Sequence, residues 1–432
     1  MAEPLILAAD LGSTSLKVAV FDAHLRRLGA ADLDVRYLST PPPAVELDAA
    51  EAREDLARAL GEALRAAGVA GASLASVALS SQAQTFAVFG PDGRARTPFL
   101  SWLDRRGEQG ARPLREALDA REFARHTGMG FVSGGLQVSL VRYLRDARPE
   151  LFVPENAFLQ LPSFVVRELT GAPWIDENLA AMSGLYSLPG RDWWPAALDA
   201  ASLTPAQLPR LAAMGAAPAR TGAGAAAFGL PAGLPVVLAG NDQTACAYGA
   251  AIHEHGAILL TLGTAQVAYV CSDERLPTAP GAMTGPYPGG RFYKLLCSAG
   301  GSVLSDACAH IEGCETVADL LRLAADSPPG ARGIRFAFDR TGATDPWRDL
   351  RGAPADRARA VLEALVDELA GYVHALAEDW RARPLFVTGG GTRSELWPRL
   401  VGERLGTTLR PVDADPLLGA ARLALELAGP AD

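Results

Sequence analysis

An aspartate, a glycine and two hydroxyl side chains stand together where the first apolar run of the chain ends, as Asp10, Gly12, Ser13 and Thr14. A carboxylate at such a point can hold Mg²⁺ directly or through water, while the glycine and the hydroxyls can approach a phosphate. The alternative is an ordinary polar turn between two strands. By itself this group of residues therefore allows phosphate chemistry and does not establish it.

A second stretch, 256–270, has the same layout as the first, 5–22, with Gly263 and Thr264 between its two apolar runs. A strand, a turn without a bulky side chain and a returning strand explain both stretches. Such a turn can bring backbone N–H groups and small hydroxyls up to an anion. Two of these turns, one in each half of the chain, can clamp the phosphates of a nucleotide.

Asp242 follows a glycine and an asparagine at the end of the apolar strand predicted at 235–239, and it opens a predicted helix. An acid at the start of a helix often serves only as a cap. The functional alternative is a general base, because phosphoryl transfer requires a metal, correct positioning and a carboxylate that accepts the proton of the attacking hydroxyl.

Trp102, Asp104, Arg105 and Arg106 occur within five residues of each other. Sugars bind to sites that offer an aromatic ring for stacking and paired polar groups for their hydroxyls, so this segment can line a polyol pocket. A surface loop with a salt bridge would have the same composition.

A glycine triplet, 389–391, ends another apolar run and is followed by Ser394. Three glycines let a flat ring lie against the backbone, although most such triplets are simple turns. The chain contains no GxxxxGK[ST] loop, no HRD loop and no GxGxxG that opens a helix, which argues against P-loop, protein-kinase and dinucleotide-binding classes.

Strands that alternate with helices indicate an α/β architecture. Predicted strands cover 5–22 (a hairpin), 76–80, 85–89, 235–239, 256–270 (a hairpin), 384–388 and the region near 408–411. Predicted helices cover 45–67, 113–125, 136–147, 158–169, 242–251, 354–382, 396–405 and the end of the chain from 417. An Ala-, Gly- and Pro-rich stretch at 213–235 precedes the domain boundary, which we predict near residue 252, giving domains 1–252 and 253–432.

Composition narrows the class of protein. The 432 residues are 49% hydrophobic and 21% charged, with a formal net charge of −9 and no basic block, so binding to nucleic acid is not expected. No signal peptide and no membrane-spanning run are evident, and a cytoplasmic protein is the expectation. The five cysteines form no CxxC pair and indicate a reducing compartment; we expect Cys308 and Cys314 to be core or surface residues. The pair His253 and His255 lacks a third metal ligand.

Taken together, the motifs resemble those of the FGGY carbohydrate kinases, in order and over almost the whole chain. The matching segments are Asp10–Thr14, Ser80–Thr85, Trp102–Arg105, Leu169–Gly171 with Asp176–Ala180, Gly240–Asp242, Thr261–Thr264, Ser298–Gly301, Gly389–Ser394 and Asp415–Ala421. The resemblance implies two actin-like (ribonuclease H-like) ATPase domains, with ATP, Mg²⁺ and a sugar or polyol in the cleft between them. A homodimer is a possible assembly.

The resemblance also implies roles for individual residues. Asp242 would be the catalytic base and Asp10 the metal ligand. The substrate-binding residues would be Gln82, Ala83, Gln84, Trp102, Asp104, Arg105 and Asp242. The ATP-binding residues would be Gly12, Ser13, Thr14, Lys17, Gly263, Thr264, Gly300, Gly389, Gly390, Gly391 and Ser394.

The chain departs from the family at the substrate segment. Glycerol kinases carry Arg-Glu and xylulokinases Met-His where this chain has Ala83 and Gln84. Ala83 makes room and Gln84 keeps a hydrogen-bonding group without charge. We therefore expect a substrate larger than glycerol, with xylulose-like ketoses first, other ketoses next, and polyols such as erythritol behind them. The rival classes are another actin-like ATPase and a catalytically silent sugar-binding relative.

Overall fold

The computed structural model describes residues 3–38, 43–338 and 345–429, and these form two compact units. The first unit takes 1–249 together with 272–293 and 415–432, and the second takes 250–271 and 294–414. The sequence predicts a single boundary near residue 252, close to the first of these transitions. It carries no signal that the two later segments, 272–293 and 415–432, return to the first unit.

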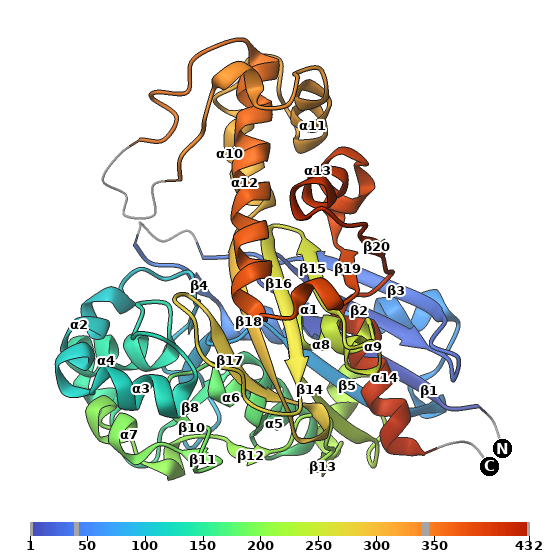
Figure 1. Ribbon diagram of the computed structural model, residues 1–432. Helices are drawn as coiled ribbons and strands as arrows, with labels where there is room; N and C mark the ends of the chain where they lie inside the picture. The colour runs from blue at the N-terminus through green and yellow to red at the C-terminus, as the bar shows by residue number, and fades with distance from the viewer. Residues whose placement is uncertain (1–2, 39–42, 339–344, 430–432) are drawn as a thin grey trace. The chain divides into compact units, whose positions relative to one another are not determined.

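The first unit is built on a six-stranded mixed sheet with the strand order β13-β14-β5-β1-β2-β3 (Figure 1). Its strands are β1 (Leu5–Leu11), β2 (Ser15–Phe21), β3 (Arg27–Asp34), β5 (Leu74–Ser81), β13 (Ala219–Arg220) and β14 (Pro235–Asn241). The hairpin predicted at 5–22 is confirmed, because β1 and β2 pair antiparallel. On its other side β1 pairs in parallel with β5, which in turn pairs in parallel with β14.

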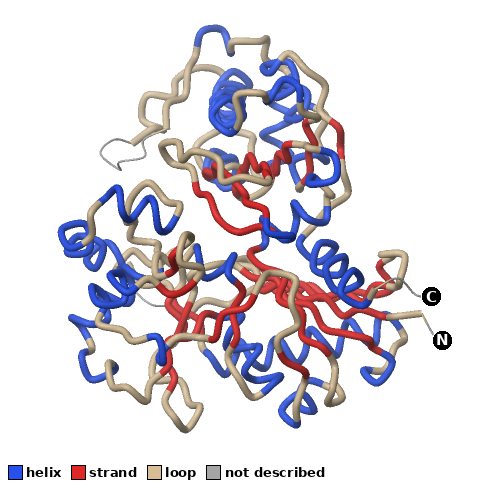
Figure 2. Tube along the Cα trace, turned by 60° about the horizontal axis from the view of Figure 1, so that its bottom comes forward, coloured by secondary structure: helices blue, strands red, loops and turns tan. Residues whose placement is uncertain are grey.

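Helices cover both faces of this sheet, as the tube in Figure 2 shows. On one face α1 (Ala49–Ala67) and α5 (Leu161–Thr170) bury apolar side chains against alternate residues of β1 and β2. On the other face lie α8 (Asp242–Gly249) and α14 (Pro416–Ala428). Asp48 caps α1 by accepting the N–H groups of Ala50 and Glu51, which satisfies donors that the first helical turn leaves unpaired.

Smaller elements complete the first unit. A four-stranded sheet contains β4 (Glu46–Leu47), β7 (Phe99–Leu100), β6 (Phe86–Phe89) and β8 (Ala157–Gln160), and two short pairs join β9 (Trp174–Asp176) to β12 (Arg210–Ala212) and β10 (Tyr186–Ser187) to β11 (Asp192–Trp193). The remaining helices are α2 (Gly107–Ala117), α3 (Ala120–Thr127), α4 (Gln137–Ala147), α6 (Glu177–Ala181) and α7 (Pro195–Ala201).

A second six-stranded sheet has the order β17-β18-β16-β15-β19-β20. Its strands are β15 (Ile258–Leu262), β16 (Ala265–Ser272), β17 (Met283–Tyr287), β18 (Arg291–Ala299), β19 (Leu385–Thr388) and β20 (Arg410–Pro411). The helices of the second unit are α9 (Ile252–His255), α10 (Gly301–Cys308), α11 (Val317–Ala325), α12 (Pro354–Leu376) and α13 (Leu396–Leu405). The predicted second hairpin is confirmed, since β15 and β16 pair antiparallel.

Four helix predictions missed an observed limit by three residues or more. The helix expected at 45–67 starts only at Ala49, because Glu46 and Leu47 form β4 and Asp48 is the cap. The helix expected at 113–125 is two helices, because Asp119 interrupts it and caps α3 through the N–H groups of Arg121 and Glu122. The first residues of 158–169 belong to β8, which pairs with β6, and α5 begins only at Leu161. The long helix from Pro354 ends at Leu376, because Ala377 adopts an extended conformation.

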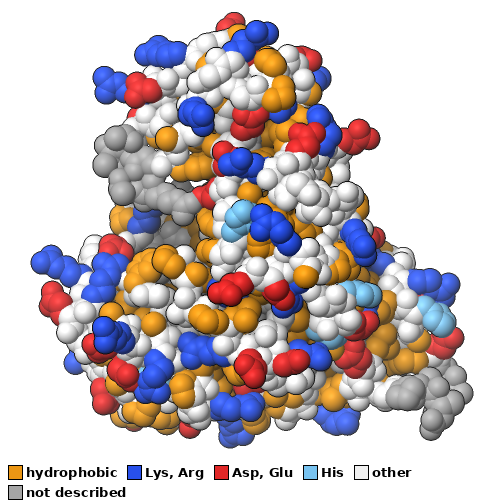
Figure 3. Space-filling model, viewed as in Figure 1, with side chains coloured by type: hydrophobic (Ala, Val, Ile, Leu, Met, Phe, Trp, Pro, Cys, Tyr) orange, Lys and Arg blue, Asp and Glu red, His pale blue; other side chains and the backbone are white. Residues whose placement is uncertain are grey.

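A helix that spans a membrane must be long and apolar, and binding to a polyanion requires a continuous basic surface. No helix within the described ranges is both long and apolar enough to cross a bilayer. On the face drawn in Figure 3, basic and acidic side chains are interspersed. That face presents no extended basic surface.

Candidate active site

The first turn, between β1 and β2, is supported by hydrogen bonds from residues 35 and 37. The Tyr37 hydroxyl donates to the Ser13 carbonyl (2.8 Å), and the Val35 N–H donates to the Thr14 carbonyl (2.9 Å). Gly12 and Ser13 are half-buried, while the Thr14 side chain is exposed. Because the supporting bonds use carbonyl oxygens, the Thr14 hydroxyl remains available to a ligand.

Asp10 lies at the end of β1 and is only 6% exposed. It stands opposite Lys17 on β2 and Ser80 on β5, and the Ser80 hydroxyl donates to its Oδ1 (2.7 Å). Burial and the charge of Asp242 raise the pKa of Asp10 to about 7, against smaller opposing effects of Ser80 and Lys17. Oδ2 has no hydrogen-bond partner among the described residues. A cation would offset both causes of the raised pKa.

Asp242 is the first residue of α8, at the point where β14 ends. Its Oδ1 accepts the N–H of Gln243 (2.8 Å), and the side chain is partly buried. Burial raises its pKa, and the hydrogen bond from Gln243 acts in the opposite direction. The charge of Asp242 thus acts on Asp10, so the residues predicted as base and metal ligand lie close enough to interact electrostatically.

A pair of buried polar residues fixes the turn before Asp242. Asp176 accepts the N–H of Gly240 (3.2 Å), and the Asn178 Oδ1 accepts the N–H of Asn241 (2.9 Å). The Asn178 amide donates to Thr244 Oγ1 (3.1 Å) and to the Pro286 carbonyl (2.7 Å). Burial raises the pKa of Asp176 to about 6. We call Asp176 and Asn178 the clamp.

Gly240 shows why this turn tolerates little change. Its φ is +74°, and a Cβ there would lie 2.6 Å from the Met214 sulfur and 3.0 Å from the Asn178 Oδ1. Only glycine fits both the backbone conformation and the space. The resemblance to the family includes the segment 176–180, which contains the clamp, but assigns it no role. The local signal in the sequence is an Asp-x-Asn pattern that begins at the end of the short strand β9.

The segment 82–85 continues from the end of β5. The Gln82 amide donates to the Gly12 carbonyl (2.9 Å), and its Oε1 accepts the Thr85 hydroxyl (2.8 Å). Thr85 Oγ1 in turn accepts the N–H of Trp102 (3.3 Å). Gln82 therefore links the first turn to the segment predicted to bind sugar.

Gln84 differs from Gln82 in its environment. It is half-buried with a φ of +72°, a left-handed conformation that is uncommon for a residue other than glycine. Its N–H donates to Gln160 Oε1 (3.3 Å), whose amide donates to Gln137 Oε1 (2.8 Å). The side-chain amide of Gln84 makes no hydrogen bond within the described part of the chain. Ala83 beside it packs on the core of this unit.

The predicted pocket loop separates into exposed and buried parts. Trp102 is 43% exposed, and Arg105 is exposed as well. Asp104 is buried and accepts bonds from the Val45 N–H (3.1 Å) and from the Arg106 guanidinium (2.6 Å). Arg106 also pairs with Glu46, and these partners raise its pKa against the opposing effect of burial. The salt bridge allowed by the sequence is present, and it is made by Arg106.

In the second unit, the turn between β15 and β16 is backed by the start of α10. The N–H groups of Gly300 and Ser302 donate to the Thr264 carbonyl (2.9 and 3.1 Å), and that of Gly301 donates to the Gly263 carbonyl (2.7 Å). Thr264 itself is exposed. The two segments predicted to bind nucleotide, at 263–264 and at 300, are therefore adjacent.

The glycine triplet follows β19 and lies against the end of β15. Gly389 has a φ of +97°, and a Cβ there would be 2.6 Å from the Leu262 carbonyl. Gly390 has open space around its Cα, whereas Gly391 packs on the Trp397 ring. Ser394 Oγ accepts the N–H of Leu396 at the start of α13 (3.2 Å). The triplet and the second turn thus form one surface of the second unit.

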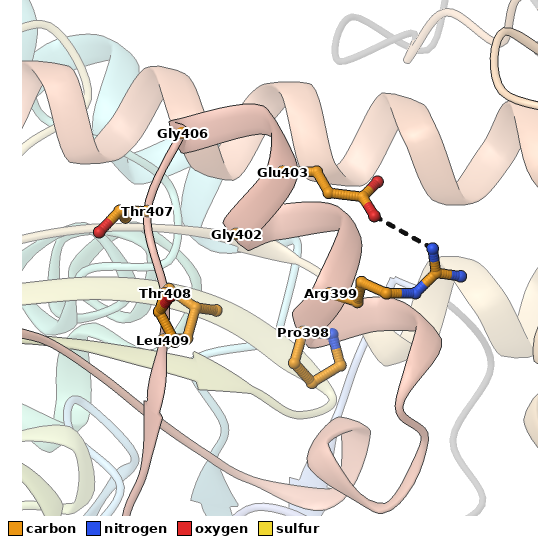
Figure 4. A pocket seen from close by; sticks show the side chains of 8 residues that line it. All are labelled: Pro398, Arg399, Gly402, Glu403, Gly406, Thr407, Thr408 and Leu409. Carbon is orange, nitrogen blue, oxygen red and sulfur yellow. Dashed lines mark hydrogen bonds and ion pairs between the residues drawn. The ribbon is translucent and has the colours of Figure 1, made fainter.

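A surface pocket of about 520 Å³ lies beside α13 and the segment that leads to β20 (Figure 4). It is lined by Pro398, Arg399, Gly402, Glu403, Gly406, Thr407, Thr408 and Leu409. Arg399 and Glu403 pair with each other there (3.0 Å). None of the predicted site residues lines it.

Comparisons with known proteins give a consistent result. A model of the N-terminal domain of the FGGY family of carbohydrate kinases matches residues 5–249, and a model of the C-terminal domain matches 258–427. A glycerol kinase of Alkalilimnicola ehrlichii is 28% identical over 98% of this chain and 90% of its own length. A glycerol kinase of Aromatoleum aromaticum is 30% identical over 97% of this chain and 89% of its own length. An L-fuculokinase of Salmonella typhi is 25% identical over 96% of this chain and 90% of its own length.

Solved structures show the same fold. The xylulose kinase of Rhodospirillum rubrum superposes with a TM-score of 0.84 at 24% identity, covering 99% of this chain and 90% of that one. The glycerol kinase of Plasmodium falciparum, solved with ADP, has a TM-score of 0.86 at 16% identity, covering 100% of this chain and 91% of that one. The expected two-domain α/β architecture is therefore confirmed.

Proposed function

We propose that this chain, which belongs to the FGGY family of carbohydrate kinases, phosphorylates a hydroxyl of a ketose, with a xylulose-like ketose as the preferred substrate. As a member of this family it is an ATP-dependent phosphotransferase with an alcohol group as acceptor. The observation that carries this proposal is the half-buried Gln84 amide, which has no partner in the described structure and stands beside the small Ala83.

The proposed base is Asp242. Its carboxylate would accept the proton of the attacking hydroxyl as the phosphoryl group is transferred. The clamp supports this role, because it accepts two hydrogen bonds from the backbone immediately before Asp242, and Asn178 is itself held by its bond to the Pro286 carbonyl. A carboxylate held in this way needs no reorientation when the substrate binds.

Asp10 is the proposed ligand of Mg²⁺. The residues present fit such an ion, because Oδ2 is unpaired in the described structure and the pKa of Asp10 is raised by burial and by Asp242. Although the described residues hold no cluster of three or more His, Cys, Asp or Glu side chains, Mg²⁺ commonly takes only one or two protein carboxylates beside phosphate and water. When bound, the ion neutralises charge on the transferred phosphoryl group. Ser80 keeps the Asp10 carboxylate oriented.

ATP contacts are proposed in both units. They are Gly12, Ser13, Thr14 and Lys17 in the first, and Gly263, Thr264, Gly300, Gly389, Gly390, Gly391 and Ser394 in the second. Hydrogen exchange with a non-hydrolysable ATP analogue tests them. Slower exchange is expected at 10–17, 261–266 and 388–394, and protection confined to other segments would contradict the assignment.

The preferred substrate should be the one that pairs with the polar groups of the proposed pocket. Glycerol would leave space beside Ala83 and the Gln84 amide unpaired, and an unpaired buried polar group costs about 1–3 kcal/mol. The hydroxyls of a longer ketose would pair with Gln84, with the Trp102 ring providing a surface for stacking. Asp104 would act mainly by holding Arg106 in place, because the Arg106 guanidinium pairs with its carboxylate.

Glycerol is the second candidate. The relatives at 28% and 30% identity are named glycerol kinases, and both are matched over almost the whole of this chain. Those names describe the relatives, and the residues at 83 and 84 differ from the Arg-Glu that we expect in glycerol kinases.

A substrate panel decides between the candidates. It should contain pentuloses, hexuloses, heptuloses, erythritol and glycerol, each assayed for kcat/KM with ATP and Mg²⁺. D-xylulose or a related ketose is expected to give the highest value, and glycerol at the top would refute the pocket argument. Gln84→Ala should lower kcat/KM for the ketose roughly 3- to 10-fold, the effect of one neutral hydrogen bond. The matched control is Gln109→Ala, an exposed glutamine on α2.

A further inference from the structure

Two cysteines six positions apart meet at the far end of α10. The Cys314 thiol donates to the Cys308 sulfur, with a sulfur–sulfur distance of 2.7 Å. The sulfurs are therefore within about 1 Å of the separation found in a disulfide. Nothing in the spacing of these residues suggests a CxxC motif, so the contact comes from the fold of the segment between them.

The segment between the cysteines is a tight turn that keeps them together. Cys308 is the last residue of α10, and its sulfur also contacts the Leu304 carbonyl (3.2 Å). Gly313, with a φ of +77°, reverses the chain, and the Cys314 N–H donates to the Ile311 carbonyl (3.2 Å). Thr316 then caps α11 in a reciprocal arrangement with Asp319. Both partners are thus anchored to helix ends.

The two thiols differ in access to solvent. Cys308 is half-buried, whereas Cys314 is 7% exposed. The Cys308 sulfur is therefore the more accessible of the two to a small oxidant, and the buried Cys314 sulfur is in contact with it. This is the arrangement of an attacking cysteine with its resolving partner. Burial and the hydrogen bond to Cys308 raise the pKa of Cys314 to about 12 in the reduced pair.

We propose that Cys308 and Cys314 form a reversible dithiol–disulfide site that is oxidised by hydroperoxides. In the first step the Cys308 sulfur attacks one peroxide oxygen, the O–O bond breaks, and sulfenic acid and one water form. In the second step the Cys314 sulfur attacks the Cys308 sulfur, the S–OH bond breaks, and the disulfide and a second water form. Two thiols lose two electrons and two protons, and hydrogen peroxide becomes two waters.

The site does not depend on the proposed substrate. In a reducing compartment disulfides are usually transient and redox-sensing, and a dithiol reductant would restore the thiols through a mixed disulfide. The pair sits at the C-terminal end of α10, the helix whose first residues support the turn at Gly263 and Thr264.

Mass spectrometry of the full chain tests the proposal. The reduced protein is treated briefly with hydrogen peroxide, blocked with N-ethylmaleimide and cleaved after glutamate without reduction. Glu312 lies between the two cysteines, so cleavage leaves one fragment with Cys297 and Cys308 (275–312) and another with Cys314 (313–315). A disulfide that links these fragments and persists in Cys297→Ser is the Cys308–Cys314 bond. The linked species, the two fragments minus two hydrogen atoms and with a maleimide label on Cys297, is expected after peroxide and should disappear with dithiothreitol.

Variants separate this site from general thiol oxidation. Cys314→Ser should trap Cys308 as a sulfenic acid that dimedone labels. Cys297→Ser, which removes an exposed cysteine nearby in the sequence, should leave the linkage unchanged. Retention of both maleimide labels after peroxide, irreversible oxidation of Cys308 alone, or a disulfide with any other cysteine would overturn the proposal.

Discussion

Replacing Asp10 with asparagine is expected to flatten the pH dependence of stability and to make the chain more stable than the wild type at pH 8. The substitution keeps the size of the side chain and an oxygen that accepts the Ser80 hydroxyl. It removes a carboxylate that is only 6% exposed and whose charge is opposed by Asp242. The geometry of the turn should therefore persist while the electrostatic cost is removed.

The size of the effect follows from the pKa. Asp10 titrates at about 7 in the folded chain and near the ordinary value of 3.8 when unfolded. The folded state therefore binds the Asp10 proton more tightly than the unfolded state, and this contribution to stability is complete below about pH 4 and lost as pH rises through 7. Between pH 5 and pH 7 the loss is roughly 2–3 kcal/mol, at about 1.4 kcal/mol for each pH unit.

Urea unfolding at pH 5 and pH 8, without nucleotide or Mg²⁺, measures this difference. Circular dichroism and tryptophan fluorescence should be followed together, because coincident transitions are required for a single free energy of unfolding. The advantage of Asp10→Asn over the wild type should grow from pH 5 to pH 8. Asp32→Asn, which removes an exposed carboxylate on β3, is the control. Equal pH dependence of Asp10→Asn and the wild type would refute the reasoning.

Three further outcomes are expected. Asp242→Asn should lower kcat on the order of a hundredfold or more, because it cannot accept a proton, and near-normal turnover would remove it as the base. Asn178→Ala should lower kcat with little change in the KM for the sugar, and it should destabilise the chain by about 1–3 kcal/mol; Asn156→Ala, which removes a buried amide whose one side-chain bond among the described residues is to the Leu151 carbonyl, should reproduce the instability without the kinetic effect. In the pH profile, kcat/KM should fall as pH drops below about 7 because Asp10 becomes protonated, and a flat profile down to pH 5 would exclude an essential ionised Asp10.

The local parts of the fold could be predicted because their signals are local. Each hairpin is specified by two apolar runs around a small turn, and both lie where the pattern predicts, as β1–β2 and β15–β16. The end of α2 could have been predicted as well, since Asp119 is a typical cap followed by a glutamate three residues later. The strand β8 could not, because residues 157–160 are extended only through pairing with β6, which is distant in sequence.

Pairing between strands that are distant in sequence also limits which residues of the candidate site can be predicted from the sequence. Asp10 was identified from its own turn, but the Ser80 that orients it comes from a parallel neighbour, and parallel partners have no fixed spacing in sequence. The same holds for Asn178, whose hydrogen bonds reach residues 63, 66 and 108 positions away. Residue type and motif can therefore predict candidate reacting groups, whereas the residues that position them emerge only from the fold.

Gln82 and Gln84 show how far residue type alone can define a pocket. The resemblance to the family predicts both as substrate-binding residues. The Gln82 amide bonds to Gly12 and Thr85 and so belongs to the framework of the first turn, whereas the Gln84 amide is held half-buried on a left-handed residue with no partner in the described structure. Substrate selectivity depends on the polar groups that folding leaves unpaired, because those are the groups whose desolvation a wrong substrate cannot offset. The specificity of this kinase should therefore respond to Gln84 and its neighbour Ala83, while changes at Gln82 should act first on the first turn, between β1 and β2.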